Sequence, residues 1–458
     1  MQTVHFIAIG GQGMSGIARI LLDRGYRVTG SDLQASNLTD RLQELGAEIH
    51  IGHRAENLGN PDVIVVSSAI HPDNPELVQA RSRGIPVVHR MDMLLEAVRG
   101  KRLLAIAGTA GKTTTSAMTA WILTEAGMDP TYLVGGEFGP EGNAHPGKGE
   151  YAIFETDESD GSFLKVRADI ALATNIDNDH LDHWGSMEAL EQGFYQFLDG
   201  IKSGGTKIAC VDDTRLRRFA ASRKDAKTYS TEGAGALWEC RDVNQQGWSS
   251  AARVFLEGRE VAYLDLQVPG AHNVQDALGA VAAACATGLS PERATAALSS
   301  FGGVKRRLER IGEFDEVLVL DDFAHHPGKI KASIAAVRSV LPGRKVIVVF
   351  QPHRYSRTRL LKDEFGQALA VADVVYVTGI YAGPGEDKEK GVSAAFISDA
   401  VEAMGHAPAR LIPDMDEAAQ EAARASRPGD VILTVGAGDV WKTHSILRDT
   451  LSDRASNR

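Results

Sequence analysis

The sequence predicts an α/β protein with parallel sheets, organised into about three domains. A chain of 458 residues is too long for a single hydrophobic core. Short buried-strand patterns alternate with helical patterns in the first and last thirds of the chain, and two strands open directly into glycine turns that continue as helices. Polar joints divide the chain into segments 1–98, 99–311 and 312–458, which we expect to be the domains.

The composition is that of an ordinary soluble globular protein. The chain has 49 Lys and Arg residues against 60 Asp and Glu, a formal charge of −11, which argues against a nucleic-acid partner because phosphate backbones require clustered cations. Three cysteines without C-x-x-C spacing predict neither a disulfide framework nor a thiolate zinc site. The N-terminus lacks a basic leader and no apolar run reaches about 18 residues. We expect a cytoplasmic protein without a membrane partner; the oligomeric state stays open.

An apolar strand at 103–107 is followed by a glycine turn and a helical pattern. The turn reads Gly108, Thr109, Ala110, Gly111, Lys112, Thr113 and Thr114. Glycines allow backbone N–H groups to close around phosphate oxygens, and the helix N-terminus adds its dipole. Lys112 would reach the terminal phosphates and the Thr113 hydroxyl would ligate Mg²⁺. The strict eight-residue phosphate-loop pattern is not met, because Ile106 occupies its first glycine, so the shorter form predicts nucleotide binding.

A second glycine loop follows the strand predicted at 4–9. Gly11, Gly13 and Gly16 satisfy G-x-G-x-x-G between a strand and a helix. Asp32 follows a second strand, at 26–29, where a ribose-binding carboxylate is expected. Alone, this pattern indicates NAD and an oxidoreductase; more generally it predicts a ligand that carries a diphosphate. The alternative is that the glycines serve only tight packing.

Polar clusters follow two strands of the middle segment. The strand at 151–154 ends in the acidic stretch 155–160, and the strand at 170–176 ends in 177–183. Open parallel sheets bind ligands beyond the carboxyl ends of their strands, so both clusters are expected beside the phosphate loop. Oxygen ligands with one imidazole suit Mg²⁺ or Mn²⁺. A His180–His183 zinc pair and a solvated acidic turn are the alternatives.

The last third repeats this arrangement. The strand at 346–350 ends near His353, Arg354 and Arg357, and the strand at 317–320 ends in an acidic and histidine-rich turn. Two arginines beside a histidine could form forked hydrogen bonds to a carboxylate or phosphate, or they could form surface salt bridges.

Three other features have simpler interpretations. Asn273 at the start of an alanine-rich helix is expected to be its N-terminal cap. The basic cluster 305–307 either faces a polyphosphate or forms a hinge. The strand 431–435, followed by a glycine turn, is expected at the packing edge of the last domain.

Together the motifs resemble the Mur ligases of bacterial cell-wall synthesis, and most closely the branch that adds L-alanine to UDP-N-acetylmuramate. The resemblance covers nearly the whole chain, at residues 8–16, 108–115, 155–163, 174–182, 270–274, 303–307, 321–327 and 350–358. The tripeptide-recycling branch is the nearest competitor, but residues 157–163 look more like the alanine-adding branch. A catalytically idle, regulatory nucleotide-binding homologue is a further alternative.

The resemblance implies a three-domain Mur ligase. Its N-terminal domain is Rossmann-like and binds the UDP-sugar, its central domain is a P-loop-type ATPase, and its C-terminal domain is Rossmann-like and brings the amino acid. The implied substrates are UDP-N-acetylmuramate, L-alanine and ATP, with Mg²⁺ or Mn²⁺, and the implied reaction passes through an acyl phosphate. The first glycine loop then holds a UDP diphosphate and not NAD.

The resemblance also assigns residues to each part of the site. UDP-sugar binding falls to Gly11, Gln12, Gly13, Met14, Ser15, Asp32 and Ser68. ATP binding falls to the loop from Gly108 to Thr114 with Asn273, Arg307 and Asp322; catalysis to Lys112, Glu155 and His180; metal binding to Thr113, Glu155 and His180. The amino-acid and muramoyl end is assigned to His325, His353, Arg354 and Arg357. Ala110 replaces a common histidine, Phe323 a common tyrosine and Gln12 a common apolar residue.

Overall fold

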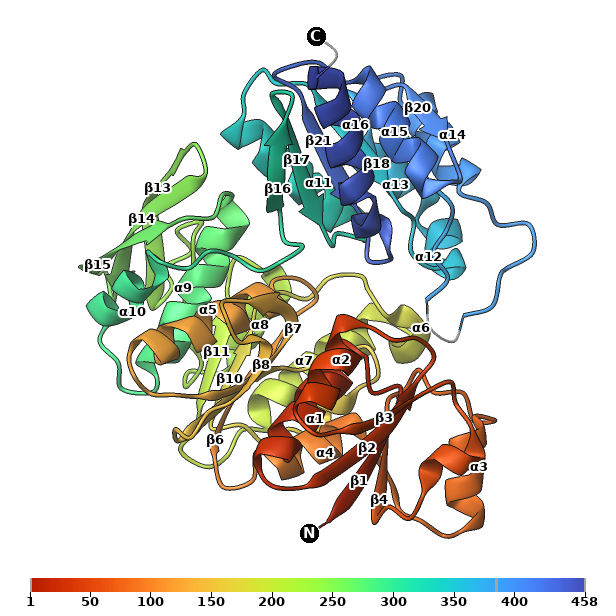
Figure 1. The fold of residues 1–458 in the computed structure, drawn as a ribbon. Coiled ribbons are helices and arrows are strands. Elements are labelled where there is room, and N and C mark those ends of the chain that lie inside the picture. The colour runs from red at the N-terminus through yellow and green to blue at the C-terminus, as the bar shows by residue number, and fades with distance from the viewer. Residues whose placement is uncertain (1, 384–385, 457–458) are drawn as a thin grey trace. The chain divides into compact units, whose positions relative to one another are not determined.

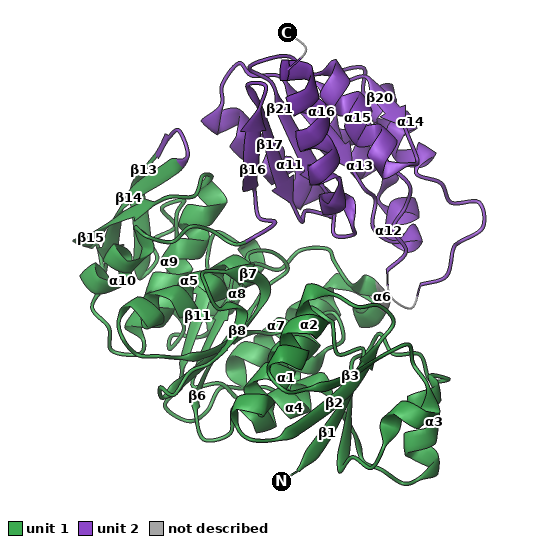
Figure 2. Ribbon diagram, in the orientation of Figure 1, with its two compact units in different colours: residues 1–244, 249–304 green, residues 245–248, 305–458 purple. Residues whose placement is uncertain are grey.

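The computed structural model describes residues 2–383 and 386–456, which group into two compact units (Figure 1, Figure 2). The first unit comprises residues 1–244 and 249–304, and the second comprises 245–248 and 305–458. Unit 1 contains two sheets and unit 2 contains the third. The predicted α/β class is confirmed.

The first sheet is five-stranded, fully parallel and ordered β3-β2-β1-β4-β5. Its strands are β1 (Thr3–Ile7), β2 (Arg27–Asp32), β3 (Glu48–Ile51), β4 (Val63–Val66) and β5 (Val87–His89), connected by α1 (Gln12–Asp23), α2 (Asn37–Glu44), η1 (Ala55–Leu58), α3 (Pro75–Ser82) and α4 (Arg90–Ala97). Alternate residues of β1 face opposite cores: Phe6 packs with α1, α2 and α4, and Ile7 packs with α3. The strand is shorter than predicted because Ala8, with φ 63°, begins the glycine turn.

The second sheet has ten strands in the order β15-β14-β13-β12-β11-β10-β6-β9-β7-β8. The strands are β6 (Arg102–Ala107), β7 (Thr131–Phe138), β8 (Gly142–Pro146), β9 (Tyr151–Glu155), β10 (Ile170–Ala173), β11 (Thr206–Cys210), β12 (Lys227–Ser230), β13 (Trp238–Gln246), β14 (Ser249–Leu256) and β15 (Arg259–Leu266). The helices are α5 (Lys112–Glu125), η2 (Ser162–Lys165), α6 (Leu181–Trp184), α7 (Met187–Asp199), α8 (Thr214–Ser222), α9 (Ala271–Cys285) and α10 (Pro291–Leu298). The parallel centre β10-β6-β9 carries the predicted phosphate-loop strand.

The two sheets of unit 1 share one hydrophobic core. Side chains of α1, such as Ile17 and Leu21, belong to the same buried cluster as Leu133 of β7. A Cβ at Gly16 would lie 2.1 Å from Leu133 Cδ1, so α1 packs against β7 with no room for a side chain at this position. Arg19 adds polar contacts, donating to the backbone oxygens of Glu141 and Ala144. The first glycine loop and the second sheet are therefore parts of one packed body.

Unit 2 contains a six-stranded sheet in the order β16-β17-β21-β18-β19-β20. Its elements are β16 (Glu309–Phe314), β17 (Val317–Asp322), α11 (Pro327–Val340), β18 (Val346–Phe350), α12 (Tyr355–Leu360), α13 (Lys362–Leu369), β19 (Val374–Val377), α14 (Ala395–Ala403), β20 (Ala409–Leu411), α15 (Met415–Ala425), β21 (Val431–Val435), η3 (Val440–Thr443) and α16 (His444–Ser456). Helices α11, α13 and α14 cover one face, and α15 and α16 cover the other.

The predicted position of residues 431–435 is wrong. Strand β21 is not at an edge but pairs in parallel with β17 on one side and β18 on the other. All five of its residues are buried, as expected for a continuous apolar strand between two layers of helices.

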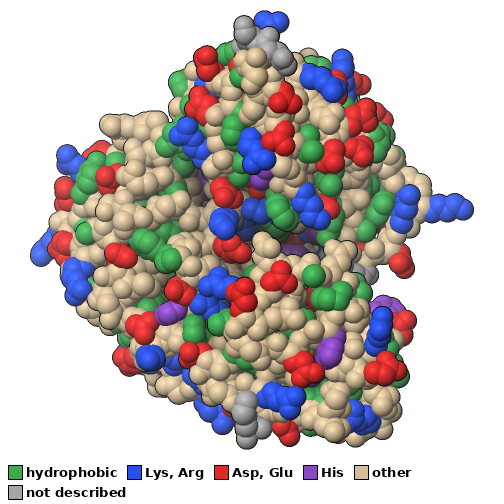
Figure 3. Space-filling view, viewed as in Figure 1, with side chains coloured by type: hydrophobic (Ala, Val, Ile, Leu, Met, Phe, Trp, Pro, Cys, Tyr) green, Lys and Arg blue, Asp and Glu red, His purple; other side chains and the backbone are tan. Residues whose placement is uncertain are grey.

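Neither unit shows a membrane-spanning element in its described part: no helix within 2–383 and 386–456 is both long and apolar enough. Acidic and basic side chains are interspersed on the face shown in Figure 3.

Candidate active site

The phosphate loop joins β6 to α5, as the sequence predicts. Gly111 caps the helix in the left-handed conformation, with φ 80°. Gly108 has φ 148°, and a Cβ there would lie 1.8 Å from Thr174 Oγ1. Asn175 holds the turn between them, because its Oδ1 accepts from Ala110 N at 2.8 Å and its Nδ2 donates to Ala110 O at 3.0 Å. The loop is thus shaped by a side chain to which the sequence analysis gave no role.

Lys112 forms an ion pair with a buried carboxylate. Its Nζ lies 2.9 and 2.8 Å from the two carboxylate oxygens of Glu158 and 2.5 Å from Gly108 O. The Glu158 side chain is only 1% exposed. Burial alone would lower the pKa of Lys112, but the charges of Glu158, Asp157 and Glu155 outweigh it and raise the pKa above its ordinary value. Lys112 is therefore a cation at neutral pH. The acidic stretch singled out in the sequence contains its partner, Glu158, which was not identified.

Thr113 and Glu155 bring a hydroxyl and a carboxylate side by side. Thr113 Oγ1 donates to Glu155 Oε2 at 2.8 Å. Glu155 reaches this position because Gly135 has no side chain; a Cβ there would lie 1.9 Å from Glu155 Oε1. A hydroxyl and a carboxylate fit Mg²⁺, which usually takes few protein ligands and keeps water or phosphate oxygens in the other positions. Within residues 2–383 and 386–456, no cluster of three or more His, Cys, Asp or Glu side chains is arranged to hold a metal alone.

His180 follows β10 and precedes the short helix α6. It adopts a left-handed conformation, with φ 57°, and its Nε2 lies 3.7 Å from Asp179 Oδ2. Its neighbour His183 contacts the Trp184 ring edge-to-face, at 5.3 Å between centroids. The role of His180 in holding a second Mg²⁺ stays a prediction.

Helix α9 begins beside the phosphate loop, but Asn273 is not its cap. The helix starts at Ala271 after Gly270, and Asn273 Nδ2 donates to Pro269 O at 2.6 Å. The cap prediction is wrong because Gly270, with φ 102°, makes the turn one residue before the helix. A Cβ at Gly111 would lie 2.3 Å from Asp276 Oδ1, which places the first turns of α9 against the loop.

The first glycine loop lies between β1 and α1. Gly10 N donates to Asp32 Oδ2 at 2.8 Å, and Gly11 occupies the N-cap position. Gln12 O accepts from Asn143 Nδ2 at 2.9 Å. Ser15 Oγ also donates to Gln12 O, at 3.1 Å, while the Met14 side chain is buried in the core. Asp32 therefore holds the loop, and its predicted contact with a ribose is untested.

The acidic stretch of the second sheet contacts residues that follow strands of the first sheet. Ser68 Oγ donates to Asp160 Oδ2 at 2.5 Å, and His89 Nε2 lies 3.3 Å from the same oxygen. Arg90 Nη2 donates to Asp157 Oδ2 at 2.7 Å. Burial opposes ionisation of Asp160, but its hydrogen bonds with His89 and Ser68, together with others, hold its pKa well below the ordinary value. His89 and Arg90 were missed, although His89 is the last residue of β5 and Arg90 directly follows it.

In unit 2, Asp322 ends β17 directly before Phe323, and Arg307 lies over the Phe323 ring. The Asp322 carboxylate is buried and accepts backbone N–H groups of Leu308 at 2.8 Å and Ala324 at 2.7 Å. Burial raises the pKa of this carboxyl despite the nearby Arg307 charge. The Arg307 guanidinium lies 5.1 Å from the Phe323 ring centroid. The ring of Phe323, which stands where a tyrosine is common, therefore makes a cation–π contact.

The predicted residues near the end of β18 form a real cluster within unit 2. The His353 ring contacts the His325 ring at 5.7 Å and stacks on Tyr381 at 5.7 Å. Arg357 Nη1 lies 3.2 Å from His353 Nδ1, and because arginine can only donate, that nitrogen accepts. Burial and the arginine charges lower the pKa of His353 to about 4. Arg354 begins the turn with φ 70°.

The two histidines of this cluster are neutral at pH 7. The pKa of His325 lies well below its ordinary value, first because of burial and then because of cations including Lys329 and Arg357. Both arginines therefore carry the positive charge while the imidazoles serve as neutral hydrogen-bonding groups. This combination suits an anionic ligand such as a carboxylate.

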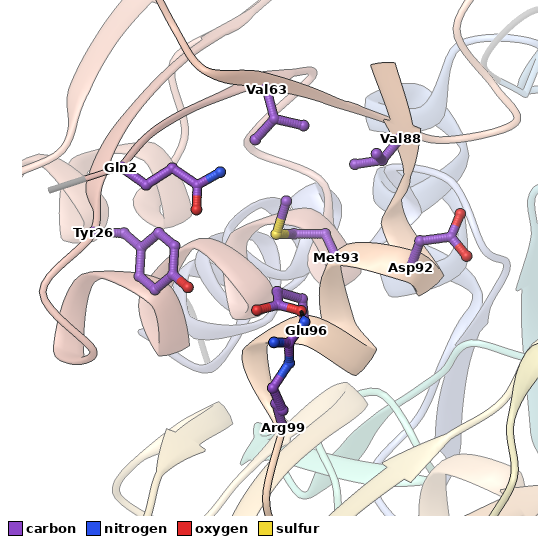
Figure 4. Close-up of a pocket in the computed structure, with 8 residues that line it drawn as sticks. All are labelled: Gln2, Tyr26, Val63, Val88, Asp92, Met93, Glu96 and Arg99. Atoms are coloured by element: carbon purple, nitrogen blue, oxygen red, sulfur yellow. Dashed lines mark hydrogen bonds and ion pairs between the residues drawn. The ribbon is translucent and has the colours of Figure 1, made fainter. Parts of the chain in front are cut away.

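A pocket at the amino ends of the strands of the first sheet contains none of these residues (Figure 4). It is bounded by Gln2, Tyr26 and Val63, at the amino ends of strands, and by side chains of α4. Ligand sites in open α/β sheets lie at the carboxyl ends, where both glycine loops are found. The glycine loops and their charged neighbours, and not this pocket, therefore indicate the end of the strands at which we expect the nucleotide.

Comparisons with known proteins match the whole chain. Three family models cover it in sequence: "Mur ligase family, catalytic domain" at residues 3–102, "Mur ligase middle domain" at 106–284 and "Mur ligase, glutamate ligase domain" at 306–438. The UDP-N-acetylmuramate–L-alanine ligase of Pelotomaculum thermopropionicum is 46% identical, over 96% of this chain and 95% of that protein. The protein of the same name from Geobacter sp. strain M21 is 42% identical, over 96% of each.

Solved structures agree with these matches. The UDP-N-acetylmuramate–alanine ligase MurC of Thermotoga maritima superposes with a TM-score of 0.84 at 28% identity, covering 100% of both chains. The murein peptide ligase of Psychrobacter arcticus gives a TM-score of 0.73 at 25% identity, covering 99% of both. The matches extend over all three sheets, and the expected three-domain architecture is confirmed. The chain belongs to the Mur ligase family.

Proposed function

We propose that this protein is an ATP-dependent ligase that joins L-alanine to the carboxylate of UDP-N-acetylmuramate in peptidoglycan precursor synthesis. The observation that carries the proposal is the phosphate loop of unit 1, where Lys112, Thr113 and Glu155 converge. It is supported by 40–46% identity, over nearly the full length, to proteins named UDP-N-acetylmuramate–L-alanine ligase. The name of the Psychrobacter relative makes a peptide-adding ligase the second candidate.

Each segment of the chain receives one task. Residues 1–98 bind the UDP-sugar through the first glycine loop, Asp32 and Ser68. Residues 99–311 bind ATP through the phosphate loop and Asn273. Residues 312–458 bring the amino acid through the cluster around His353, and Arg307 of the middle segment and Asp322 of the last segment also contact ATP. These assignments rest on the resemblance and, for the two glycine loops and the cluster around His353, on placement at the carboxyl ends of parallel strands.

The reaction proceeds in two steps. The muramoyl carboxylate attacks the γ-phosphorus of ATP, the bond to the bridging oxygen breaks, and ADP leaves with that electron pair. The alanine amine then attacks the acyl carbon, and the tetrahedral intermediate expels inorganic phosphate to leave an amide. Both encounters need charge neutralisation and exclusion of water, which would otherwise hydrolyse the acyl phosphate.

Lys112 provides the fixed positive charge for the first step. Its ammonium is held at the mouth of the loop by Glu158 and Gly108 O, so it stands where loop N–H groups would meet phosphate oxygens. The oxygen atoms of Thr113 and Glu155 would hold one Mg²⁺, and His180 would help to hold a second. When bound, Mg²⁺ supplies positive charge that screens the triphosphate from the attacking carboxylate.

The arginines of unit 2 bind and orient a carboxylate. Arg354 and Arg357 are charged, while His325 and His353 are neutral at pH 7 and can donate or accept single hydrogen bonds. Forked guanidinium contacts would fix the amino acid or the muramoyl group relative to its reacting atom.

One assay tests the proposal. Phosphate release from ATP is measured with UDP-N-acetylmuramate while L-alanine, L-serine, glycine and the tripeptide are offered in turn. Release that requires L-alanine is the expected result. Release only with the tripeptide would favour the recycling branch, and no release with any acceptor would favour an idle nucleotide-binding homologue.

A further inference from the structure

Arg90 lies at the edge of the first glycine loop. It is the first residue of α4 and directly follows β5, so it stands at the carboxyl edge of the first sheet together with the turn after β1. A Cβ built on Gly13 would lie 3.4 Å from Arg90 Nη1. One end of the guanidinium therefore contacts the first turn of α1, where the backbone N–H groups are not used within the helix.

The glycine loop has no cation of its own. Residues 8–16 read Ala-Ile-Gly-Gly-Gln-Gly-Met-Ser-Gly, without lysine or arginine. The phosphate loop, by contrast, carries Lys112 within its motif. A diphosphate on the first loop would meet N–H groups and a helix dipole, which neutralise only part of its charge. Arg90 supplies a planar, permanently charged donor at the same position.

Arg90 also has a competing partner. Its Nη2 donates to Asp157 Oδ2 at 2.7 Å, and the two side chains are 27% and 39% exposed. Neither group is locked in the core, so an incoming anion can reach the guanidinium from solvent. A bidentate phosphate contact is available if Asp157 gives up its share of Arg90.

We propose that Arg90 binds the diphosphate of the UDP-sugar and that Asp157 competes with the diphosphate for the Arg90 guanidinium. The inference rests on the proposed UDP-sugar function of the glycine loop. Arg90 thereby becomes the cation that this loop lacks, supplied from a different helix. Asp157 adjoins Glu158, the partner of Lys112, so the exchange takes place in the segment that also serves the phosphate loop.

The test is calorimetric titration of the full-length protein with UDP, using Arg90→Gln and Asp157→Asn. Arg90→Gln should weaken UDP binding about 10-fold or more, which corresponds to about 1.4 kcal/mol. Asp157→Asn should strengthen UDP binding by about 2- to 5-fold, because a neutral amide competes less for Arg90. Both single effects are measured against Arg27→Gln, a matched control in the same unit whose Nη2 pairs with Glu48 at 3.1 Å.

Uridine separates a phosphate contact from general damage to the site. Uridine is allowed to compete with UDP, and its binding is followed by ligand-observed NMR. The affinity for uridine should be nearly the same in Arg90→Gln as in wild type, because uridine carries no phosphate. If Arg90→Gln does not fold, Arg90→Lys, which keeps the charge and loses the fork, should give an intermediate loss, and Asp157→Asn tests the competition independently.

The outcomes are distinct. Equal UDP affinity of Arg90→Gln and wild type, or equal loss of uridine and UDP, would overturn the diphosphate contact. Weaker UDP binding in Asp157→Asn would overturn the competition. If the wild-type protein binds neither UDP nor UDP-N-acetylmuramate, the proposed function itself is wrong. If UDP binds with an affinity that does not depend on Arg90, only the Arg90 contact is wrong and the proposed function is unaffected.

Discussion

The charged clusters of the two units shift the pKa of their titratable groups in opposite directions. In unit 1, Lys112 is surrounded by carboxylates, and the pKa of its ammonium is raised. In unit 2, burial first and neighbouring cations second lower the pKa of the His325 and His353 imidazoles. Both clusters follow parallel strands, so the fold alone does not set the sign of the charge. We infer from this difference that the Lys112 cluster suits a metal ion together with a polyphosphate, and that the cluster around His353 suits an anionic group such as a carboxylate.

The largest expected effect comes from removing the cation of the unit 1 cluster. Lys112→Ala should reduce ADP release about 100-fold or more, because the developing phosphoryl charge loses a preorganised partner, while UDP binding to the first loop persists. Steady-state ADP release and UDP titration measure the two effects. Lys202→Ala removes a lysine whose contact is the exposed pair with Asp169 and should change neither. Full turnover of Lys112→Ala would refute its assigned role.

The shape of the two glycine loops gives the next largest effect. Gly108→Ala combines φ 148° with a Cβ 1.8 Å from Thr174 Oγ1, whereas the nearest atom to a Cβ at Gly13 is Arg90 Nη1 at 3.4 Å. Gly108→Ala should cost about 2 kcal/mol or more in stability of unit 1, and Gly13→Ala less than about 1 kcal/mol. Urea unfolding followed by far-UV circular dichroism compares them. Equal costs would mean that the phosphate loop relaxes freely.

The local parts of this site could be predicted from the sequence. Strand, glycine turn and helix occur consecutively along the chain, so the loops after β1 and β6 were identified correctly from apolar runs and glycine spacing. The cluster of His353 and Arg357 also lies within one turn of chain. Such features depend on neighbours in sequence, which is what motif spacing reports.

Both polar clusters of the middle segment were expected beside the phosphate loop, but the individual partners could not be predicted, because strand order brings them together. Glu158 is 46 residues from Lys112, and Asn175 is 65 residues from Ala110. Both contacts require β10, β6 and β9 to be adjacent, an order that no local pattern encodes. The same reason explains the misplaced strand β21: its apolar run predicted a buried strand but not which strands would flank it.

Removing a cation from the unit 2 cluster should affect binding more than chemistry. Arg354→Ala and Arg357→Ala should raise KM for L-alanine or for UDP-N-acetylmuramate about tenfold or more, since hydrogen bonds to charged groups contribute about 1.5–3 kcal/mol. Initial rates with each substrate varied separately identify which one is affected. Arg424→Ala, an exposed arginine of the same unit that pairs with Glu421, is the control. Unchanged KM for both substrates would leave the two arginines as surface residues.

The smallest effect is a pH dependence that distinguishes the two clusters. His353 has a pKa of about 4 in the folded protein against an ordinary value of 6.5, so the unfolded chain binds the extra proton first as the pH falls. The stability that depends on neutral His353 is present above pH 6.5 and is lost progressively toward pH 4. Between pH 7 and pH 5 the loss should be about 2 kcal/mol. His353→Gln should flatten this part of the urea-midpoint profile, and the exposed His406→Gln should not. An identical slope in wild type and His353→Gln would mean that burial and the arginine neighbours do not hold His353 neutral, and the contrast between the two units would then rest on Lys112 and His325.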